Sequence, residues 1–478
     1  MSVAAPVTPE QFVSQDGGRL ANFRLIPRID TYPRVVAFAQ TAAGKIVLLA
    51  LFGLGLAYSR GQTWWALTLW LVLTTFLPDR RRMLVTIGTL FFTIPVFFLG
   101  FTHRQLYIVV LLGSVLVLGA TLFWSAAHWP RSWYGRRPVF FFLSGFAVLI
   151  LFASSIPETT RYYHLVWDFT AILSLYIWFI AYSLLDRKAP DCDPFGLQLG
   201  TYLPFWGSTN TPLPKGAAYL RRIEARDAGQ LAVTQLKGLK LLVWSILISL
   251  FAHLFAQCVH GYLRIPTFAQ ALSLSVSRTP LPWYTCWASL IAGFFEIIMD
   301  FSVWGHRFVA CCRMAGFNAL RNTYRPLSSR TVAEFFNRFY YYYKELLVDV
   351  FFYPTFLRYF KRNGKLRLVA AIFAAACFGN AFYHFVRDLG FIQKLGLVRA
   401  LVGYQVFVFY CVALATAISI SRLRHRGPAP TGFIRGKLWP SFSVGVFYCL
   451  LDIFGSTERN YPLTEHFRFL AHLFNVNL

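Results

Sequence analysis

The sequence predicts an all-α, polytopic integral membrane protein. Of its 478 residues, 56% are hydrophobic and 18% are aromatic, which is more apolar surface than a soluble chain of this length buries in its core. The hydrophobic residues form runs close to the roughly 20 residues that a transmembrane helix needs. Only 14% of the residues are charged, and the basic ones fall between these runs. Together these observations exclude a soluble globular enzyme.

About eleven runs qualify as transmembrane helices, and re-entrant or interfacial helices complete the predicted fold. The runs cover residues 45–60, 62–78, 83–102, 106–126, 138–156, 162–185, 238–260, 283–303, 366–388, 398–421 and 437–455. A further segment, 343–360, is half polar and is one more candidate. No internal repeat and no separate soluble domain is visible in the sequence.

The net charge of +26 is carried by loops that alternate along the chain. Basic residues follow the second, fourth and sixth runs, whereas the loops after the first, third and fifth carry few. Cytosolic loops are enriched in lysine and arginine, so this pattern predicts a cytosolic N-terminus and contact with anionic lipid, and no nucleic-acid partner. Arginine outnumbers lysine, which indicates a bacterial source. The predicted location is therefore the bacterial inner membrane.

Neither the cysteines nor the histidines form a metal-site pattern. The eight cysteines lie mostly in or beside hydrophobic runs and include no C-x-x-C pair, which is typical of small buried side chains. The ten histidines are scattered, and the sequence has no phosphate-binding or dinucleotide-binding glycine motif. We therefore expect no metal and no tightly bound cofactor.

Most of the polar residues with chemical potential lie in one stretch, residues 296–388. In its last hydrophobic run, Asn380, His384 and Asp388 are spaced by four, which places them on one face of a helix. A polar face is costly in lipid, so this one is expected to face protein or a wet cavity. A neutral imidazole with a carboxylate one turn away can act as a general base. The alternative is a structural histidine bonded to a neighbouring helix.

Residues 322–354 form a second polar segment, too aromatic for an ordinary loop. Asn337 and Arg338 lie there among phenylalanines and four consecutive tyrosines. This composition predicts an amphipathic helix at the membrane interface.

The order of these motifs resembles the membrane-bound O-acyltransferase (MBOAT) family, in particular its bacterial branch that acylates exported polysaccharides. Residues 322–326 read N-T-Y-R-P, and residues 334–340 read E-F-F-N-R-F-Y. Pro354 follows fourteen residues after Tyr340, then G-K-L-R at 364–367, and finally His384. Each motif is weak by itself, but the ordered set with matching spacings is specific.

The resemblance implies that an acyl group, acetyl or another short one, moves from a cytosolic thioester to a hydroxyl of an exported polysaccharide, glycolipid or lipid. His384 would take the hydroxyl proton, and Asn337 and Tyr340 would position the donor or stabilise the oxyanion. Further substrate contacts are expected from Arg325, Arg338, Asn380 and Tyr383. Acyl-CoA or an acyl-carrier thioester would be a co-substrate, and an accessory extracytoplasmic protein is an expected partner.

One departure from the family pattern keeps other functions open. Tyr340 stands where the family places histidine or asparagine, and Phe336 and Phe339 stand where it places tryptophan. A tyrosine can still donate and accept a hydrogen bond. The alternatives are a transporter or flippase that uses the same polar residues without chemistry, and an inactive scaffold of the same fold.

The matched region, roughly residues 200–390, fixes the expected organisation of the chain. The predicted parts are a cytosolic or interfacial N-terminal segment, N-terminal transmembrane helices, a cytosolic loop, an MBOAT-like catalytic core, and C-terminal transmembrane helices with a tail. The N-terminal segment covers residues 1–44 and the N-terminal transmembrane helices 45–185. The cytosolic loop covers 186–237, the catalytic core 238–390, and the C-terminal helices with the tail 391–478.

Overall fold

The computed structural model describes residues 25–60, 64–93, 103–187, 192–202, 215–424, 432–455 and 461–476. Throughout these ranges the chain is helical, with no strand and one isolated bridge between Glu224 and Phe317. The predicted all-α fold is thereby confirmed. Residues 1–24 of the predicted N-terminal segment lie outside the described ranges, as do 94–102 of the third predicted span.

Nine helices in the described ranges are long and apolar enough to cross a bilayer, so the chain is a multi-pass membrane protein. They cover Ala42–Ser59, Leu106–His128, Pro138–Ser155, Tyr163–Asp186, Ala228–Tyr262, Trp283–Met314, Gly364–Arg387, Gln405–Leu423 and Ile434–Gly455. The predicted span 62–78 is instead a shorter helix, α3 (Trp64–Phe76). It stops there because Pro78 cannot continue the hydrogen-bond ladder. The count of eleven stays a prediction.

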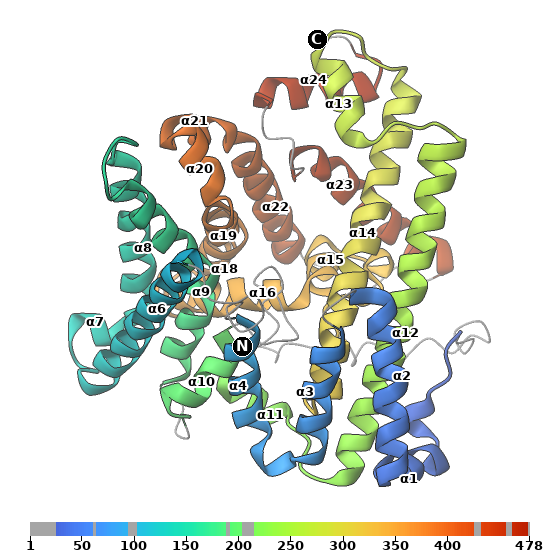
Figure 1. Ribbon diagram of the computed structural model, residues 1–478. Coiled ribbons are helices and arrows are strands. Elements are labelled where there is room, and N and C mark those ends of the chain that lie inside the picture. Colours follow the sequence, from blue (N-terminus) through green and yellow to red (C-terminus); the bar gives the residue numbers. More distant parts are fainter. Residues whose placement is uncertain are drawn as a thin grey trace.

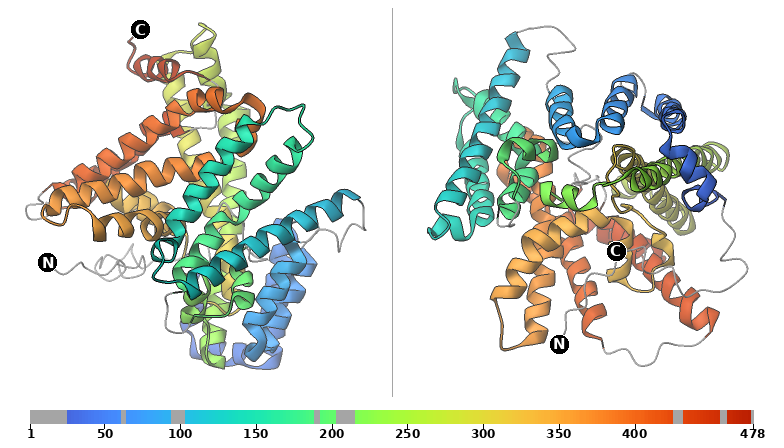
Figure 2. Two further views of the ribbon diagram at one scale, coloured as in Figure 1. Left: turned by 90° about the vertical axis from the view of Figure 1, so that its left-hand side faces the viewer. Right: turned by 90° about the horizontal axis from the view of Figure 1, so that it is seen from below.

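Two groups of long helices flank a central segment (Figure 1). One group, on the left of Figure 1, contains α6 (His103–His128), α8 (Pro138–Ser155) and α9 (Tyr163–Asp186). The other contains α2 (Ala42–Arg60), α12 (Ala228–Ala256) and α14 (Trp283–Met314). The view from below shows the same separation, with the central segment between them (Figure 2). The central segment, residues 332–387, thus starts between the two groups and also packs against the helix Gln405–Leu423.

The central segment is a chain of short helices that ends in a long one. Its elements are α15 (Val332–Phe339), α16 (Tyr341–Leu347), π-helical η8 (Val348–Phe352), α17 (Tyr353–Arg358), α18 (Gly364–Ile372), π-helical η9 (Phe373–Gly379) and α19 (Asn380–Arg387). The candidate span 343–360 is therefore divided among α16, η8 and α17, and it is not among the nine apolar helices described above.

The remaining helices include two of the nine long apolar ones, Gln405–Leu423 and Ile434–Gly455, and several short ones. They are α1 (Pro33–Gln40), α4 (Arg81–Thr93), α7 (Trp133–Arg136), α10 (Phe195–Tyr202), α11 (Ala217–Ile223), α13 (Phe268–Val276), α20 (Leu389–Leu395), α21 (Leu397–Gly403), α22 (Gln405–Leu423), η10 (Ile434–Leu438), α23 (Trp439–Gly455) and α24 (Leu463–Leu473). The predicted loop 186–237 contains α10, α11 and the start of α12, which begins ten residues before the predicted span 238–260.

Two glycines permit close approaches that position the core. A Cβ on Gly238 of α12 would lie 3.1 Å from the carbonyl oxygen of Ala310, so this glycine lets α12 and α14 pack closely. A Cβ on Gly379 of η9 would lie only 2.5 Å from the Phe351 ring of η8. The absence of a side chain at Gly379 therefore allows η8 and η9 to lie against each other, which brings α16 next to α19.

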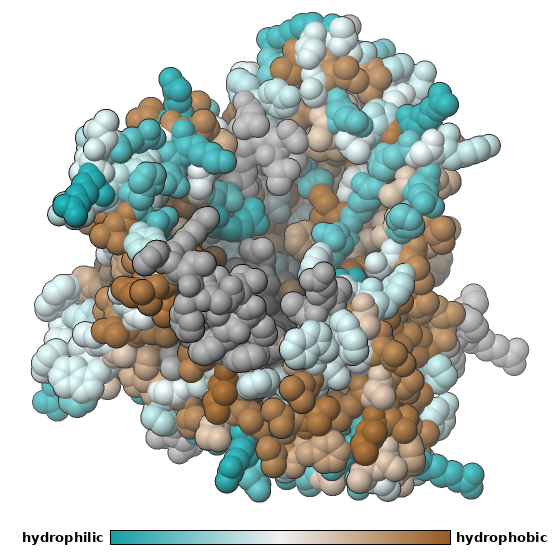
Figure 3. All heavy atoms as spheres, in the orientation of Figure 1, coloured by the Kyte–Doolittle hydropathy of each residue, from teal (hydrophilic) through white to brown (hydrophobic). Residues whose placement is uncertain are grey.

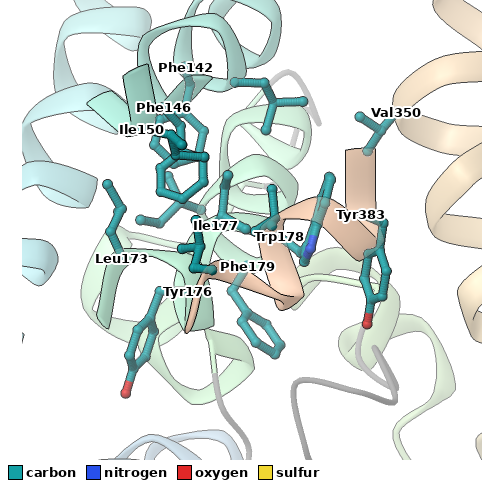
Figure 4. Close-up of a cluster of buried hydrophobic side chains, with 14 of the residues drawn as sticks. Phe142, Phe146, Ile150, Leu173, Tyr176, Ile177, Trp178, Phe179, Val350 and Tyr383 are labelled. Atoms are coloured by element: carbon teal, nitrogen blue, oxygen red, sulfur yellow. The ribbon is translucent and has the colours of Figure 1, made fainter. Parts of the chain in front are cut away.

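The largest buried cluster lies where α9 meets η8 and α19 (Figure 4). Trp178 of α9 points toward Tyr383 of α19, and the two rings stack with centroids 5.4 Å apart. The outer surface is apolar over α2, α3 and α12, where brown side chains cover the lower right of Figure 3 and polar ones lie at its lower edge. That distribution is the one expected of a helix surface in contact with lipid tails.

Candidate functional site

His384 lies half-buried on α19, inside a ring of aromatic side chains. The centroid of its ring lies 4.3 Å from that of Phe407 on α22 and 5.5 Å from that of Tyr383. Tyr343 of α16 approaches edge-on, with its centroid 6.1 Å away. These apolar walls limit the contact of the imidazole with water.

Tyr343 joins the polar face of α19 to α16. Its hydroxyl donates a hydrogen bond to the side-chain oxygen of buried Asn380, one turn before His384. Both Asn380 and His384 therefore face Tyr343, as their spacing predicted. The sequence alone did not single out Tyr343, although its place in a run of four tyrosines beside a predicted site was a signal.

Asp388 lies at the C-terminal end of α19. Helix α19 ends at Arg387, and Asp388 has a non-helical backbone, with φ −99° and ψ 27°. Its carboxylate pairs with the neighbouring Arg387, at 3.3 Å. Its amide donates to the His384 carbonyl at 3.0 Å, so Asp388 caps the last turn of α19, one turn beyond the imidazole.

Tyr340 lies at the junction of α15 and α16, next to the histidine site. Its ring centroid lies 5.4 Å from that of Tyr343 and 5.2 Å from that of Phe301 on α14. Burial raises the pKa of its phenol well above 10, and the nearby Tyr383 adds to the shift. At neutral pH Tyr340 is thus a protonated hydroxyl, able to donate a hydrogen bond to a developing oxyanion. Asn337 lies half-buried, three residues earlier on α15.

Of the predicted substrate contacts, Arg338 lies on α15 and Arg325 in the loop before that helix. The buried Arg338 pairs with Glu334 at 2.7 Å and donates to the Ser328 hydroxyl at 3.0 Å. Its backbone carbonyl accepts from the amide of Tyr324 at 2.8 Å. These contacts give Arg338 a structural role in folding the loop onto α15. Arg325 is exposed, with its guanidinium 5.7 Å from the Tyr324 ring.

A cavity of about 360 Å³ lies on the other side of α16 and η8. It is lined by Tyr182, Leu185, Asp186, Lys215, Ala218, Tyr219, Arg222, Asp349 and Tyr353. Sequence reasoning missed this site. Charged residues at Glu345 and Asp349, four apart in a half-apolar segment, were the signal that could have indicated it.

Lys215 organises the charge of the cavity. It pairs with Glu345 and, at 3.2 Å, with Asp349, whose carboxylate also accepts from the Tyr182 hydroxyl at 3.3 Å. Burial raises the pKa of Asp349 despite Lys215. Burial also opposes ionisation of Glu345, but Lys344 and Lys215 hold the pKa of that carboxyl below its usual value. The protein thus shifts the pKa values of the two carboxyl groups in opposite directions, upward for Asp349 and downward for Glu345.

The cavity and the histidine site share the same two structural elements. On α9, Trp178 stacks on Tyr383, and Tyr182, one turn later, bonds to Asp349. On α16 and η8, Tyr343 faces His384, and Asp349 faces the cavity. Tyr343 and Asp349 are six residues apart, so less than two helical turns separate the residue that faces His384 from the one that lines the cavity.

Other polar residues of the membrane helices form helix–helix contacts. Glu296 of α14 pairs at 2.8 Å with His260, which lies in the π-helical η6 (Gln257–Tyr262) that continues α12. Asp168 accepts from Tyr107 at 3.1 Å, a bond between α9 and α6. Among the described residues, no three histidine, cysteine or acidic side chains are placed to hold a metal ion.

No protein-family model matches this chain, and no curated protein does. Function is therefore inferred from the residues of the chain itself.

Proposed function

We propose that the protein is a membrane-embedded O-acyltransferase that moves an acyl group, acetyl or another short one, from a thioester to a hydroxyl acceptor. The observation that carries this proposal is the meeting of Tyr340, Tyr343 and His384. These residues come from the two segments whose ordered motifs resemble the MBOAT family. A transporter without chemistry would not need a half-buried imidazole walled by aromatic rings.

His384 is proposed as the general base. Its imidazole takes the proton of the acceptor hydroxyl, and the oxygen attacks the thioester carbonyl carbon. The tetrahedral oxyanion forms next to Tyr340, whose protonated phenol donates to it. The carbon–sulfur bond then breaks, and the leaving thiolate takes the proton back from His384. The reaction consumes one thioester and one hydroxyl and yields one ester and one thiol.

The proposed donor route runs through the Lys215 cavity, in keeping with a cytosolic thioester. Lys215 and Arg222 supply positive charge, while Asp186 and Asp349 balance it. We propose that acyl-CoA or an acyl-carrier thioester reaches His384 along the shared face of α9 and α16. With the basic loops in the cytosol, this proposal places the protein in the bacterial inner membrane with its N-terminus inside.

Purified protein in lipid nanodiscs tests the proposal. Wild type and the His384→Ala and His384→Gln variants are supplied with labelled acetyl-CoA and hydroxylated acceptors, and both thiol release and acyl transfer are measured. Removal of a general base is expected to lower the rate by about 100-fold or more. His128→Ala, which changes an exposed histidine of α6, is the matched control and should keep full activity.

Two outcomes would overturn the proposal. One is equal thiol release by wild type and His384→Ala at unchanged melting temperature, which is the result expected of an inactive scaffold. The other is passage of a substrate across the membrane without thioester consumption, which would establish a transporter.

A further inference from the structure

The turn between α17 and α18 exposes large apolar side chains. We call residues 357–366 the hairpin tip. Leu357 is 65% exposed, Tyr359 52%, Phe360 50% and Leu366 45%. Isolated exposed apolar residues are common, but four within ten residues form a patch that calls for a partner.

The same segment is strongly basic. Arg358, Lys361, Arg362 and Lys365 are all exposed, and the chain has no acidic residue between Asp349 and Asp388. No carboxylate of the hairpin itself can therefore neutralise the four cations.

Phe360 gives an independent sign that the tip has a function. Its φ is +51°, in the left-handed region that favours glycine or asparagine. The amide of Asn363 donates to its carbonyl at 3.0 Å and closes the turn. A strained backbone beneath a half-exposed aromatic ring indicates that the ring itself is needed there.

The tip lies at the end of a membrane-spanning helix. A candidate span begins at Gly364, so the residues just before it lie at the level of the lipid headgroups. The guanidinium of Arg367 lies 4.3 Å from the Phe356 ring, which clasps α17 to α18 and holds the tip in place. Aromatic and basic residues at this depth suit the boundary between acyl chains and phosphates.

We propose that the hairpin tip is a docking site for anionic phospholipids of the surrounding bilayer. Tyr359, Phe360 and the two leucines insert among the acyl chains near the surface. The four cations contact the headgroup phosphates. This binding does not depend on the proposed acyl transfer, so the two proposals succeed or fail separately.

The test measures lipid preference. Protein is reconstituted in vesicles of phosphatidylcholine and phosphatidylglycerol in equal amounts, and the two lipids retained after extraction are quantified by native mass spectrometry. In the triple variant Lys361→Gln, Arg362→Gln, Lys365→Gln, the ratio of retained phosphatidylglycerol to phosphatidylcholine should fall about tenfold. The control triple Arg161→Gln, Arg264→Gln, Arg399→Gln removes the same charge from other exposed positions and should keep it. Equal preference in both triples would overturn the proposal.

Phe360→Asn separates lipid binding from folding. Asparagine tolerates the left-handed backbone, so the melting temperature in detergent should hold or rise. The phosphatidylglycerol preference should fall because the inserted ring is gone. A variant with wild-type lipid preference and a lower melting temperature would show that the ring packs for stability, and would overturn the proposal.

Discussion

The hydroxyl of Tyr343 donates a hydrogen bond to the side-chain oxygen of Asn380, and this bond fixes α16 against α19. Both residues are buried, so neither group can exchange its partner for water at little cost. The same tyrosine ring faces His384. This buried polar contact between two helices thus helps to set the position of the proposed base relative to Tyr340.

Tyr343→Phe should lower both stability and activity. The change removes the hydroxyl but keeps the ring, so the expected loss is about 1–3 kcal/mol in the free energy of unfolding, because Asn380 is left without its donor. The rate of acyl transfer should also fall at a temperature where wild type and Tyr343→Phe are both fully folded. Turnover in nanodiscs at that temperature measures this loss of activity. Tyr359→Phe, on the exposed hairpin tip, is the control and should change neither.

Neutral replacements of Glu345 and Asp349, the two carboxylates that pair with Lys215, should have opposite effects. Glu345 has a lowered pKa, so folding favours its charge, and Glu345→Gln should cost about 1–3 kcal/mol at pH 7. Asp349 has a raised pKa, so folding disfavours its charge, and Asp349→Asn should be neutral or stabilising. Melting temperatures in detergent at pH 7 test this. Destabilisation by both replacements would contradict it.

The pH dependence of these variants follows from the same shifts. The stability contributed by Glu345 is present above its unfolded-state pKa and is lost as the pH falls through its lower folded-state pKa. The difference in melting temperature between wild type and Glu345→Gln should therefore shrink on acidification below about pH 4. A difference that is constant from neutral to acidic pH would show that the effect is not electrostatic.

Gly379→Ala should destabilise the junction of η8 and η9. The new methyl group would lie 2.5 Å from the buried Phe351 ring, and the expected cost of such overpacking is about 1–3 kcal/mol. Adding Phe351→Leu should restore part of the loss. Gly390→Ala is the control because a Cβ there meets nothing within 4 Å, and alanine favours the helix. Thermal unfolding of the four proteins measures these effects.

Arg338→Met should destabilise the loop before α15, and any loss of activity should follow from that loss of stability. It removes the ion-pair partner of Glu334, 2.7 Å away in the wild type, while the Glu334 carboxylate keeps its hydrogen bond from the Arg330 amide, so the expected cost is about 1–3 kcal/mol. The double change with Glu334→Gln should recover much of the stability and, with it, the activity. If activity stays lost in a stable double variant, Arg338 has a catalytic role instead of a structural one.

Local patterns predicted the helices well where each apolar run was long and uninterrupted. Nine of the runs correspond to apolar helices of spanning length, and the predicted amphipathic segment contains the helix α15. The run 62–78 contains the shorter helix α3, which ends before Pro78, and α19 ends at Arg387 with Asp388 as its cap. Helix ends depend on local breaks and packing that hydropathy does not record.

The sequence by itself determined that the chain crosses the membrane many times and that Asn380 and His384 share a face, because helical periodicity fixes neighbours one turn apart. The tertiary structure alone decided what meets that face. Tyr343 reaches it across 37 positions of the chain, and Lys215 reaches Glu345 across 130. Such contacts depend on how whole helices pack, here on the close approach that Gly379 permits. Spacing along one helix carries no information about that packing.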